Sequence, residues 1–336
     1  MKQYFFFIFA VLTFLCAGLA AQEQQKWDID EIIPVPTSGG MWFYGDVLFF
    51  HDWHIQKNVI TGNHRLLDGN SIQRSAGTFE DCLKRLEEIQ SEEGIVPMSG
   101  SAVILLHGFV SNSLVMKTFA DYLKEKKAYD NIFCVSYPST MQSIFDHAVM
   151  LDSIVHHLPP TINRIDFIGH SLGCIVIRRY MSGPLKKDWQ LPEDKKKLVL
   201  RHQFSPDNRV GRFVMLGPPN HGSVVAKRFI GKDPFRRRLL GSSGDELGID
   251  WENMEKTLGI PSCPFAIISG GRGDGIGFSP VIPGDDDGVV STEGTKLSGA
   301  DYWIQFYTGH GQMLLTEEIF DLTLQFLKTG KIKTSK

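Results

Sequence analysis

The sequence predicts an α/β fold with a mostly parallel central sheet that is flanked by helices. From Ser101 onward, short apolar runs alternate with longer amphipathic segments, which is the pattern of repeated strand–helix units. Some runs, such as Val103–Leu106, are apolar throughout, as is typical of strands buried on both faces. The 336 residues are 42 % apolar and 22 % charged, which excludes a disordered chain, a fibrous repeat and a protein with several membrane spans.

The net charge and the spacing of possible metal ligands indicate which partners and cofactors to expect. The formal net charge of −3 gives no basic surplus that would favour nucleic acid. No CxxC pair or Cys/His cluster has the spacing of a zinc site, and His51 and His54 should face opposite sides of a strand. The three aspartates at 285–287 lack the six to eight oxygen ligands that calcium takes. We therefore expect no metal and no cofactor.

The first twenty residues have the pattern of a secretory signal peptide. Lys2 precedes the apolar run Tyr4–Leu15, and small residues follow at Gly18, Ala20 and Ala21. The alternative is an uncleaved anchor, although the run is shorter than the roughly 20 residues that span a bilayer. We expect cleavage after Ala20 or Ala21, and a mature protein that is secreted or periplasmic.

Cleavage would leave four cysteines, at positions 82, 134, 174 and 263. Four cysteines allow three complete pairings, and the sequence does not choose among them. Cys134 and Cys174 lie in apolar runs, which favours small core residues over reactive thiols.

Residues 21–97 form a lead-in with its own pattern. Trp42–Phe50 and Trp53–Ile60 are rich in aromatic and β-branched residues, which predicts two short antiparallel strands. Thr78 has the position of a helix N-cap, with Asp81 as its partner three residues later. A helix is therefore expected from Thr78 to Gly94.

Residues 98–336 carry the alternating strands and helices. Strands are predicted at Val103–Leu106, Ile132–Ser136, Ile165–Ile168, Phe213–Leu216, Phe265–Ile268 and Trp303–Tyr307. Helices are predicted at Ser113–Lys126, Ile144–His157, Leu172–Met181 and Glu317–Thr329. Two insertions, 183–211 and 223–262, interrupt the rhythm on the side of the sheet where ligands bind in such folds. They are either parts of a lid or cap, or plain surface excursions.

The strongest catalytic pattern is Gly169-His170-Ser171-Leu172-Gly173, a G-x-S-x-G. It follows a predicted strand and begins a predicted helix, which is the context this motif requires. The tight turn would push the Ser171 side chain above the sheet edge, at a helix N-terminus that favours developing negative charge. We therefore expect Ser171 to be a nucleophile rather than a helix cap.

An oxyanion needs two backbone N–H donors about 3 Å away. Leu172, directly after the nucleophile, supplies one, and Phe109 in the loop after the first parallel strand supplies the other. His107 ends that strand and is expected to order the loop rather than act as a base.

The base should follow the nucleophile along the chain, which leaves His202, His221 and His310. His202 lies in an insertion, and His221 comes before any suitable acid. His310 follows the last strand between two glycines that allow the loop to bend. We assign His310 as the general base.

The acid should follow the strand Phe265–Ile268, where Asp274, Asp285, Asp286 and Asp287 are available. Asp287 precedes a Val-Val pair that would hold it in a buried position, as its task of orienting the imidazole requires. Asp285 and Asp286 are expected to face solvent or bind loop N–H groups. Asp287 is the preferred acid, with Asp274 as the alternative.

In these motifs the chain resembles the α/β-hydrolase superfamily, in particular its bacterial lipase-like branch. The resemblance covers about residues 100–330 and rests on LLHGF, GHSLG, LGPPNHGS, DDDGVV and TGHG in that order. In secreted bacterial lipases the acid lies a little over twenty residues before the histidine, which favours Asp287. The resemblance implies an α/β-hydrolase fold, a Ser171–Asp287–His310 triad, and Phe109 and Leu172 as oxyanion donors.

The expected function is that of a serine carboxylic-ester hydrolase that acts on an ester or lipid. An acyltransferase or amidase with the same triad is the alternative, and a non-catalytic binding protein that keeps the fold is a third. The basic runs Lys195–Lys197 and Arg236–Arg238 could contact anionic lipid headgroups, although solvated surface charge is commoner.

Overall fold

The computed structural model describes residues 35–36, 42–183, 202–230 and 233–333. The expected signal peptide and most of the insertion at 183–211 lie outside these ranges. Pro34–Lys336 form one compact unit, which holds the described part of the lead-in together with the residues that follow it. Within the described ranges, no helix combines the length and the apolar character needed to cross a bilayer.

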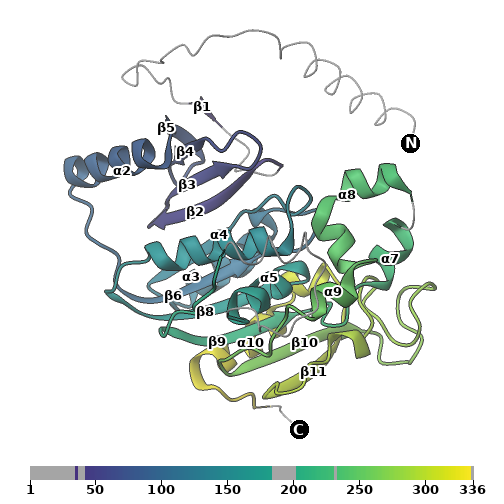
Figure 1. Cartoon of the computed structure of the whole chain (residues 1–336). Coiled ribbons are helices and arrows are strands. Elements are labelled where there is room, and N and C mark those ends of the chain that lie inside the picture. Colours follow the sequence, from purple (N-terminus) through teal and green to yellow (C-terminus); the bar gives the residue numbers. More distant parts are fainter. Residues whose placement is uncertain (1–34, 37–41, 184–201, 231–232, 334–336) are drawn as a thin grey trace. The chain divides into compact units, whose positions relative to one another are not determined.

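The central sheet has six strands in the order β11-β10-β9-β8-β6-β7, and all of its pairings are parallel (Figure 1). They are β6 (Gly100–Leu106), β7 (Asn131–Val135), β8 (Ile162–His170), β9 (Val210–Leu216), β10 (Phe265–Gly271) and β11 (Tyr302–Tyr307). Because β7 and β8 lie on opposite sides of β6, the strand order reverses there, and such a switch point opens a crevice at the carboxyl ends of the strands. The chain thus has the predicted α/β-hydrolase fold.

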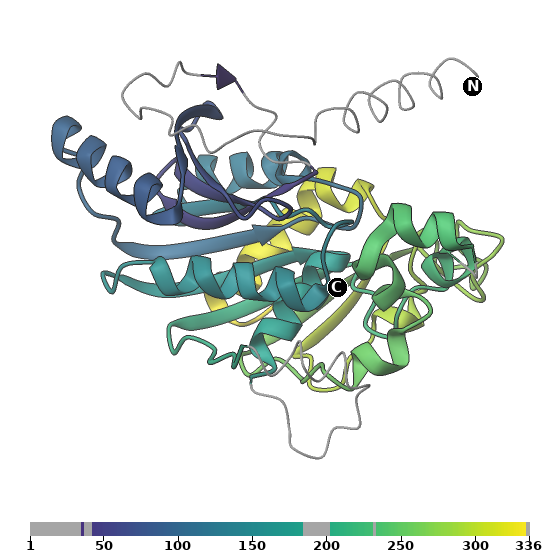
Figure 2. The same ribbon diagram turned by 45° about the horizontal axis from the view of Figure 1, so that its top comes forward.

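Helices cover both faces of this sheet (Figure 2). Ile104 packs with the buried residues of α4 and α5, whereas its neighbour Val103 packs with those of α3 and α10. This alternation follows from the period of two in a strand, and it explains why the strands are apolar throughout. The helices are α3 (Lys117–Glu125), α4 (Ile144–His157), α5 (Leu172–Met181) and α10 (Glu317–Thr329).

The lead-in forms a second sheet of five antiparallel strands, in the order β1-β5-β4-β3-β2. Its elements are β1 (Val35–Pro36), β2 (Tyr44–Phe50), β3 (Trp53–Asn58), β4 (His64–Leu67), β5 (Ile72–Gly77) and α2 (Phe79–Glu93). The two predicted strands correspond to β2 and β3, whereas β4 and β5 were not predicted. The Thr78 side chain accepts a hydrogen bond from the Asp81 backbone N–H, which is the predicted cap of α2.

The lead-in sheet shares its core with the central sheet. Val47, Leu66 and Leu86 belong to the same apolar cluster as Phe133 of β7 and Ile154 of α4. The Ser153 hydroxyl on α4 also donates to the Val47 carbonyl at 2.9 Å.

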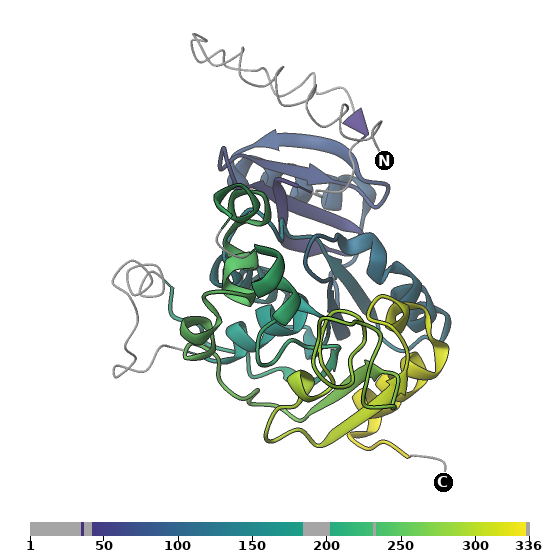
Figure 3. The same ribbon diagram turned by 90° about the vertical axis from the view of Figure 1, so that its right-hand side faces the viewer.

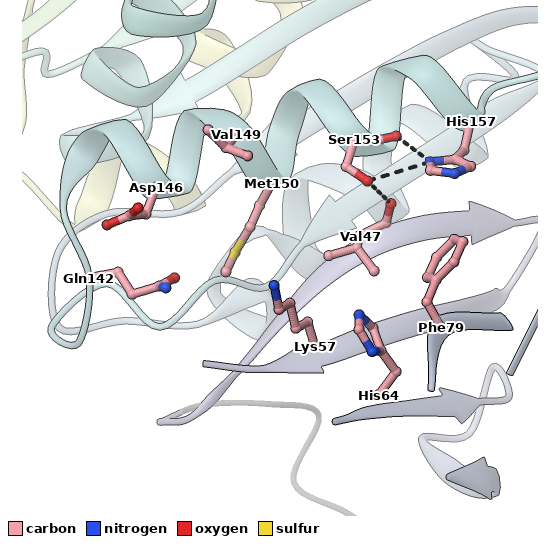
Figure 4. A pocket seen from close by; sticks show the side chains of 10 residues that line it. All are labelled: Val47, Lys57, His64, Phe79, Gln142, Asp146, Val149, Met150, Ser153 and His157. Atoms are coloured by element: carbon pink, nitrogen blue, oxygen red, sulfur yellow. Dashed lines mark hydrogen bonds between the residues drawn. The ribbon is translucent and has the colours of Figure 1, made fainter. Parts of the chain in front are cut away.

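A pocket of about 320 Å³ remains between the lead-in sheet and α4 (Figure 4). Apolar Val47, Phe79 and Met150 line it together with the polar side chains of Lys57 and His64. Its walls therefore come from both the lead-in and the central domain, in keeping with a single compact unit.

In the described part of the insertion at 223–262, the middle one of three helices packs against the other two (Figure 3). They are α7 (Val224–Ile230), α8 (Pro234–Leu247) and α9 (Trp251–Glu255). The Ser243 hydroxyl donates to the Gln142 carbonyl at 2.8 Å, and the Glu246 carboxylate accepts from the Ile144 N–H at 2.7 Å. These two bonds join the insertion to the segment between the carboxyl end of β7 and the start of α4.

The four cysteines within the described ranges are free thiols. Cys82, Cys174 and Cys263 are buried, and Cys134 is half-buried. Burial raises the pKa of Cys82 to about 11. The thiols are therefore core side chains with little thiolate character.

Candidate active site

Ser171 occupies a sharp turn between β8 and α5. Its backbone has φ 54° and ψ −122°, a conformation that is costly for any residue with a Cβ atom. Its N–H donates to the Leu216 carbonyl at 2.9 Å, which holds the turn against the end of β9. The strained backbone is the turn that the G-x-S-x-G pattern predicts.

Gly173 allows this turn to lie against the neighbouring strand. A Cβ atom at Gly173 would lie 2.5 Å from the Leu106 carbonyl oxygen and 2.7 Å from that of His107. Both are backbone atoms at the end of β6, so they cannot move aside as a flexible side chain could. A larger residue would push Ser171 away from the loop that follows β6.

The side chains of Asp287 and His310 are joined by a direct hydrogen bond. His310 Nδ1 lies 2.7 Å from Asp287 Oδ2, and the Asp287 side chain is fully buried. Asp287 Oδ1 accepts from the backbone N–H groups of Val289 at 3.0 Å and Val290 at 2.8 Å. A carboxylate fixed at both oxygens holds the proton on Nδ1 and leaves the Nε2 lone pair of the neutral ring available.

The other aspartates of this loop have different partners. Asp274 is exposed; it accepts from the N–H groups of Ile276 and Gly277 and lies 3.0 Å from the Arg272 guanidinium. Asp285 accepts from loop N–H groups, as does the buried Asp286, whose pKa is raised by burial. The structure thus brings Asp287, and not Asp274, to His310.

Ser171 and His310 lie at the same edge of the sheet. Gly217 follows Leu216, the residue that binds the Ser171 N–H, and its φ of 55° suits glycine. A Cβ atom at Gly217 would lie 3.1 Å from His310 Nδ1 and 3.2 Å from Asp287 Oδ2. His170 Nε2 lies 3.0 Å from the His310 carbonyl oxygen, which ties the base loop to the residue before Ser171.

The loop after β6 runs beside the nucleophile. A Cβ atom at Gly108 would lie 3.1 Å from the Cβ of Ser171, so the residue before Phe109 lies directly beside the nucleophile. His107 Nδ1 lies 2.8 Å from the Gly108 carbonyl oxygen. Because a trans peptide directs its C=O and N–H in opposite directions, this bond also fixes the direction of the Phe109 N–H. The Leu172 N–H lies at the start of α5.

The remaining candidate histidines lie elsewhere. His202 Nε2 is 2.7 Å from Asp152, and exposed His221 is 3.2 Å from Glu255, on the rim of a second pocket of about 610 Å³. Sequence reasoning missed the part played by His170, because the middle positions of a G-x-S-x-G pattern are unrestricted. Within the described ranges, no group of three or more metal-ligating side chains occurs.

We expect acid to destabilise the fold, because three histidine side chains are buried in it. Burial lowers the pKa of His107 to about 4, and the pKa values of His147 and His170 to about 3, from the ordinary value of 6.5. Below pH 6.5 the unfolded chain therefore binds more protons than the folded chain, so stability is complete above pH 6.5 and falls as the pH drops toward the folded values. Urea unfolding should show the free energy of unfolding falling between pH 6.5 and 4.5, by up to about 1.4 kcal/mol per pH unit for each histidine.

The variant His147→Leu provides the control, because neither ring nitrogen of His147 has a hydrogen-bond partner. Its pH dependence should be shallower than that of the wild type. An unchanged slope would contradict the assignment of a neutral, buried His147.

Comparison with known proteins gives one family match and several distant structural likenesses. Residues 100–230 match the sequence family described as "Putative serine esterase (DUF676)". Among solved structures, the mature lipase BlEst2 of Bacillus licheniformis is 15 % identical with a TM-score of 0.48, covering 68 % of this chain and 93 % of that one. The phospholipase PlaB of Legionella pneumophila is 21 % identical with a TM-score of 0.40, covering 59 % and 45 %.

A thermophilic esterase of Thermogutta terrifontis is 13 % identical with a TM-score of 0.41, covering 69 % of this chain and 91 % of its own. These structural likenesses are distant, so the fold assignment rests on the parallel strand order and the turn at Ser171. The family match spans that turn and the loop after β6. The chain has the fold of an α/β-hydrolase, and its residues 100–230 are similar to a family described as putative serine esterases.

Proposed function

We propose that this protein is a serine carboxylic-ester hydrolase with Ser171, His310 and Asp287 as its triad. The observation that carries the proposal is the 2.7 Å bond from Asp287 to His310, at the sheet edge where Ser171 occupies its strained turn. A carboxylate, an imidazole and a hydroxyl in this order are the groups that nucleophilic ester cleavage needs.

In the proposed reaction, Ser171 Oγ attacks the ester carbonyl carbon while His310 Nε2 takes the hydroxyl proton. The negative charge that develops on the carbonyl oxygen is stabilised by the N–H groups of Phe109 and Leu172. The intermediate then expels the alcohol, which takes the proton from His310, and leaves an acyl group on Ser171. Water, deprotonated by His310, releases the carboxylic acid and restores the serine.

Export is a further part of the proposal and rests on the sequence pattern of residues 1–20. N-terminal sequencing of protein recovered outside the cytoplasm should begin at Ala21 or Gln22. Contact with lipid headgroups has less support: of the run Arg236–Arg238, the middle residue is paired with Asp245 at 2.8 Å.

Hydrolysis of p-nitrophenyl esters from acetate to palmitate tests the proposed reaction. We expect turnover that follows saturation kinetics, with a chain-length optimum that reports the depth of the acyl site. If the folded protein hydrolyses none of these esters but is labelled by a fluorophosphonate, amide hydrolysis or acyl transfer with the same triad replaces the proposal. If it is neither active nor labelled, the binding-protein alternative is favoured.

A further inference from the structure

Asp46 is a buried carboxylate in the lead-in sheet, far along the chain from the proposed triad. Its Oδ1 accepts from His54 Nδ1 at 2.7 Å and from Gln56 Nε2 at 2.8 Å, and its side chain is 1 % exposed. Gln56 is oriented for this bond because its own carbonyl oxygen accepts from the Arg65 guanidinium. Each of these partners lies on β3 or β4, so the lead-in sheet fixes the position of the carboxylate.

The other oxygen of Asp46 reaches into the central domain. Oδ2 accepts from the Ser136 N–H at 2.6 Å, and the Asp46 N–H donates to the Ser136 carbonyl at 2.9 Å. The carboxylate thus faces three donors, and a group that only accepts hydrogen bonds suits all three. Ser136 also shares a hydrogen bond with Ser113, at the far end of the loop that follows β6.

Tyr137, the residue after Ser136, contacts His107 in the loop that follows β6. The Tyr137 ring stacks on His107 with centroids 4.1 Å apart and an interplanar angle of 10°. The Tyr137 hydroxyl donates to the His107 carbonyl, and its backbone N–H donates to His107 Nε2 at 3.4 Å. His107 in turn holds the Gly108 carbonyl, and with it the direction of the Phe109 N–H.

We infer that Asp46 is a positioning residue for the oxyanion hole, acting through Ser136, Tyr137 and His107 on the Gly108–Phe109 peptide. The lead-in sheet therefore has a part in the chemistry although it contributes no group that touches the substrate. The inference rests on the proposed function, since it assigns Phe109 the role of an oxyanion donor. It predicts that disturbing Asp46 weakens transition-state stabilisation and leaves ground-state binding of the ester nearly unchanged.

The main test is Asp46→Asn, which keeps the shape of the side chain. An amide has one accepting oxygen and one donating nitrogen, so in either orientation a donor would face a donor. Removing an oxyanion donor outright costs about 10²- to 10³-fold in kcat, and we expect its misalignment to cost roughly tenfold, with KM changed less than about twofold. The rate of fluorophosphonate labelling of Ser171 should fall in parallel, because that reaction develops charge on the same oxygen.

Two further variants separate positioning from stability. Tyr137→Phe keeps the ring stack and removes only the hydroxyl, so it should lower kcat in the same direction even if Asp46→Asn folds poorly. Asp52→Asn changes an exposed carboxylate in the turn between β2 and β3, and should leave kcat and labelling unchanged. In each variant kcat is expressed per serine that a fluorophosphonate labels at completion, which corrects for unfolded protein.

The inference is overturned if Asp46→Asn and Tyr137→Phe both keep wild-type kcat per labelled serine, whatever happens to their melting temperatures. It is also overturned if Asp52→Asn loses as much activity as Asp46→Asn. A wild-type protein that neither hydrolyses esters nor reacts with the fluorophosphonate would instead refute the proposed function.

Discussion

Replacing Ser171 by alanine should lower kcat for ester hydrolysis by about 10⁵-fold or more, since no other group in the proposed mechanism can form the acyl-enzyme. Fluorophosphonate labelling should be lost with it. The measurement is the initial rate with the best p-nitrophenyl ester, with Ser298→Ala, an exposed serine on the second pocket, as the matched control. Residual activity within tenfold of the wild type would exclude Ser171 as the nucleophile.

A second substitution at the same position tests the strain. Alanine keeps the Cβ atom at a φ of 54°, whereas glycine adopts this conformation without the steric cost. Ser171→Gly should therefore be as inactive as Ser171→Ala and more stable by about 1 kcal/mol in urea unfolding. Equal stability of the two variants would show that the turn carries no strain in solution.

Asp287→Asn should lower kcat by about 10³- to 10⁴-fold while the protein stays folded. The Val289 and Val290 N–H groups bind Oδ1, so the oxygen of the introduced amide would occupy that position and its nitrogen would face His310. The imidazole would then have to accept at Nδ1 and carry its proton on Nε2, where it cannot take a proton from Ser171. Steady-state kinetics together with circular dichroism would measure both effects.

Asp274→Asn is the matched control for that experiment. The oxygen of the introduced amide could still accept from the turn N–H groups of Ile276 and Gly277, so kcat should change less than about twofold. If Asp274→Asn lost activity and Asp287→Asn kept it, the acid would be wrongly assigned.

Much of the central domain could be predicted because its signals are local. The helices at Ile144–His157, Leu172–Met181 and Glu317–Thr329 have the predicted bounds, since period and end signals lie within each segment. The cap of α2 at Thr78 is equally local. In contrast, β4 and β5 were missed, because His64–Leu67 is only four residues long and Ile72–Gly77 mixes charged, polar and apolar residues.

The contacts that hold the site could not be predicted, because they join residues far apart in the sequence. Asp46 and Ser136 are separated by 90 positions, and Tyr137 and His107 by 30. Neither pair belongs to a motif, so no spacing rule indicates them. The choice of Asp287 over Asp274 did have a signal in the spacing to His310, but the reason for it is the pair of N–H groups that fixes Oδ1.

The link between Asp46 and Ser136 also covers the end of an edge strand of the central sheet. β7 is the last strand of the central sheet, and an open edge strand offers unpaired N–H and C=O groups to other chains. The bonds from Asp46 occupy both backbone groups of Ser136, where β7 ends, and the apolar residues of β2 pack beside it. A protein shortened to begin at residue 98 would therefore expose the apolar surface that the lead-in sheet covers and lose the Asp46 contact to Ser136, so we expect it to aggregate as well as to lose activity.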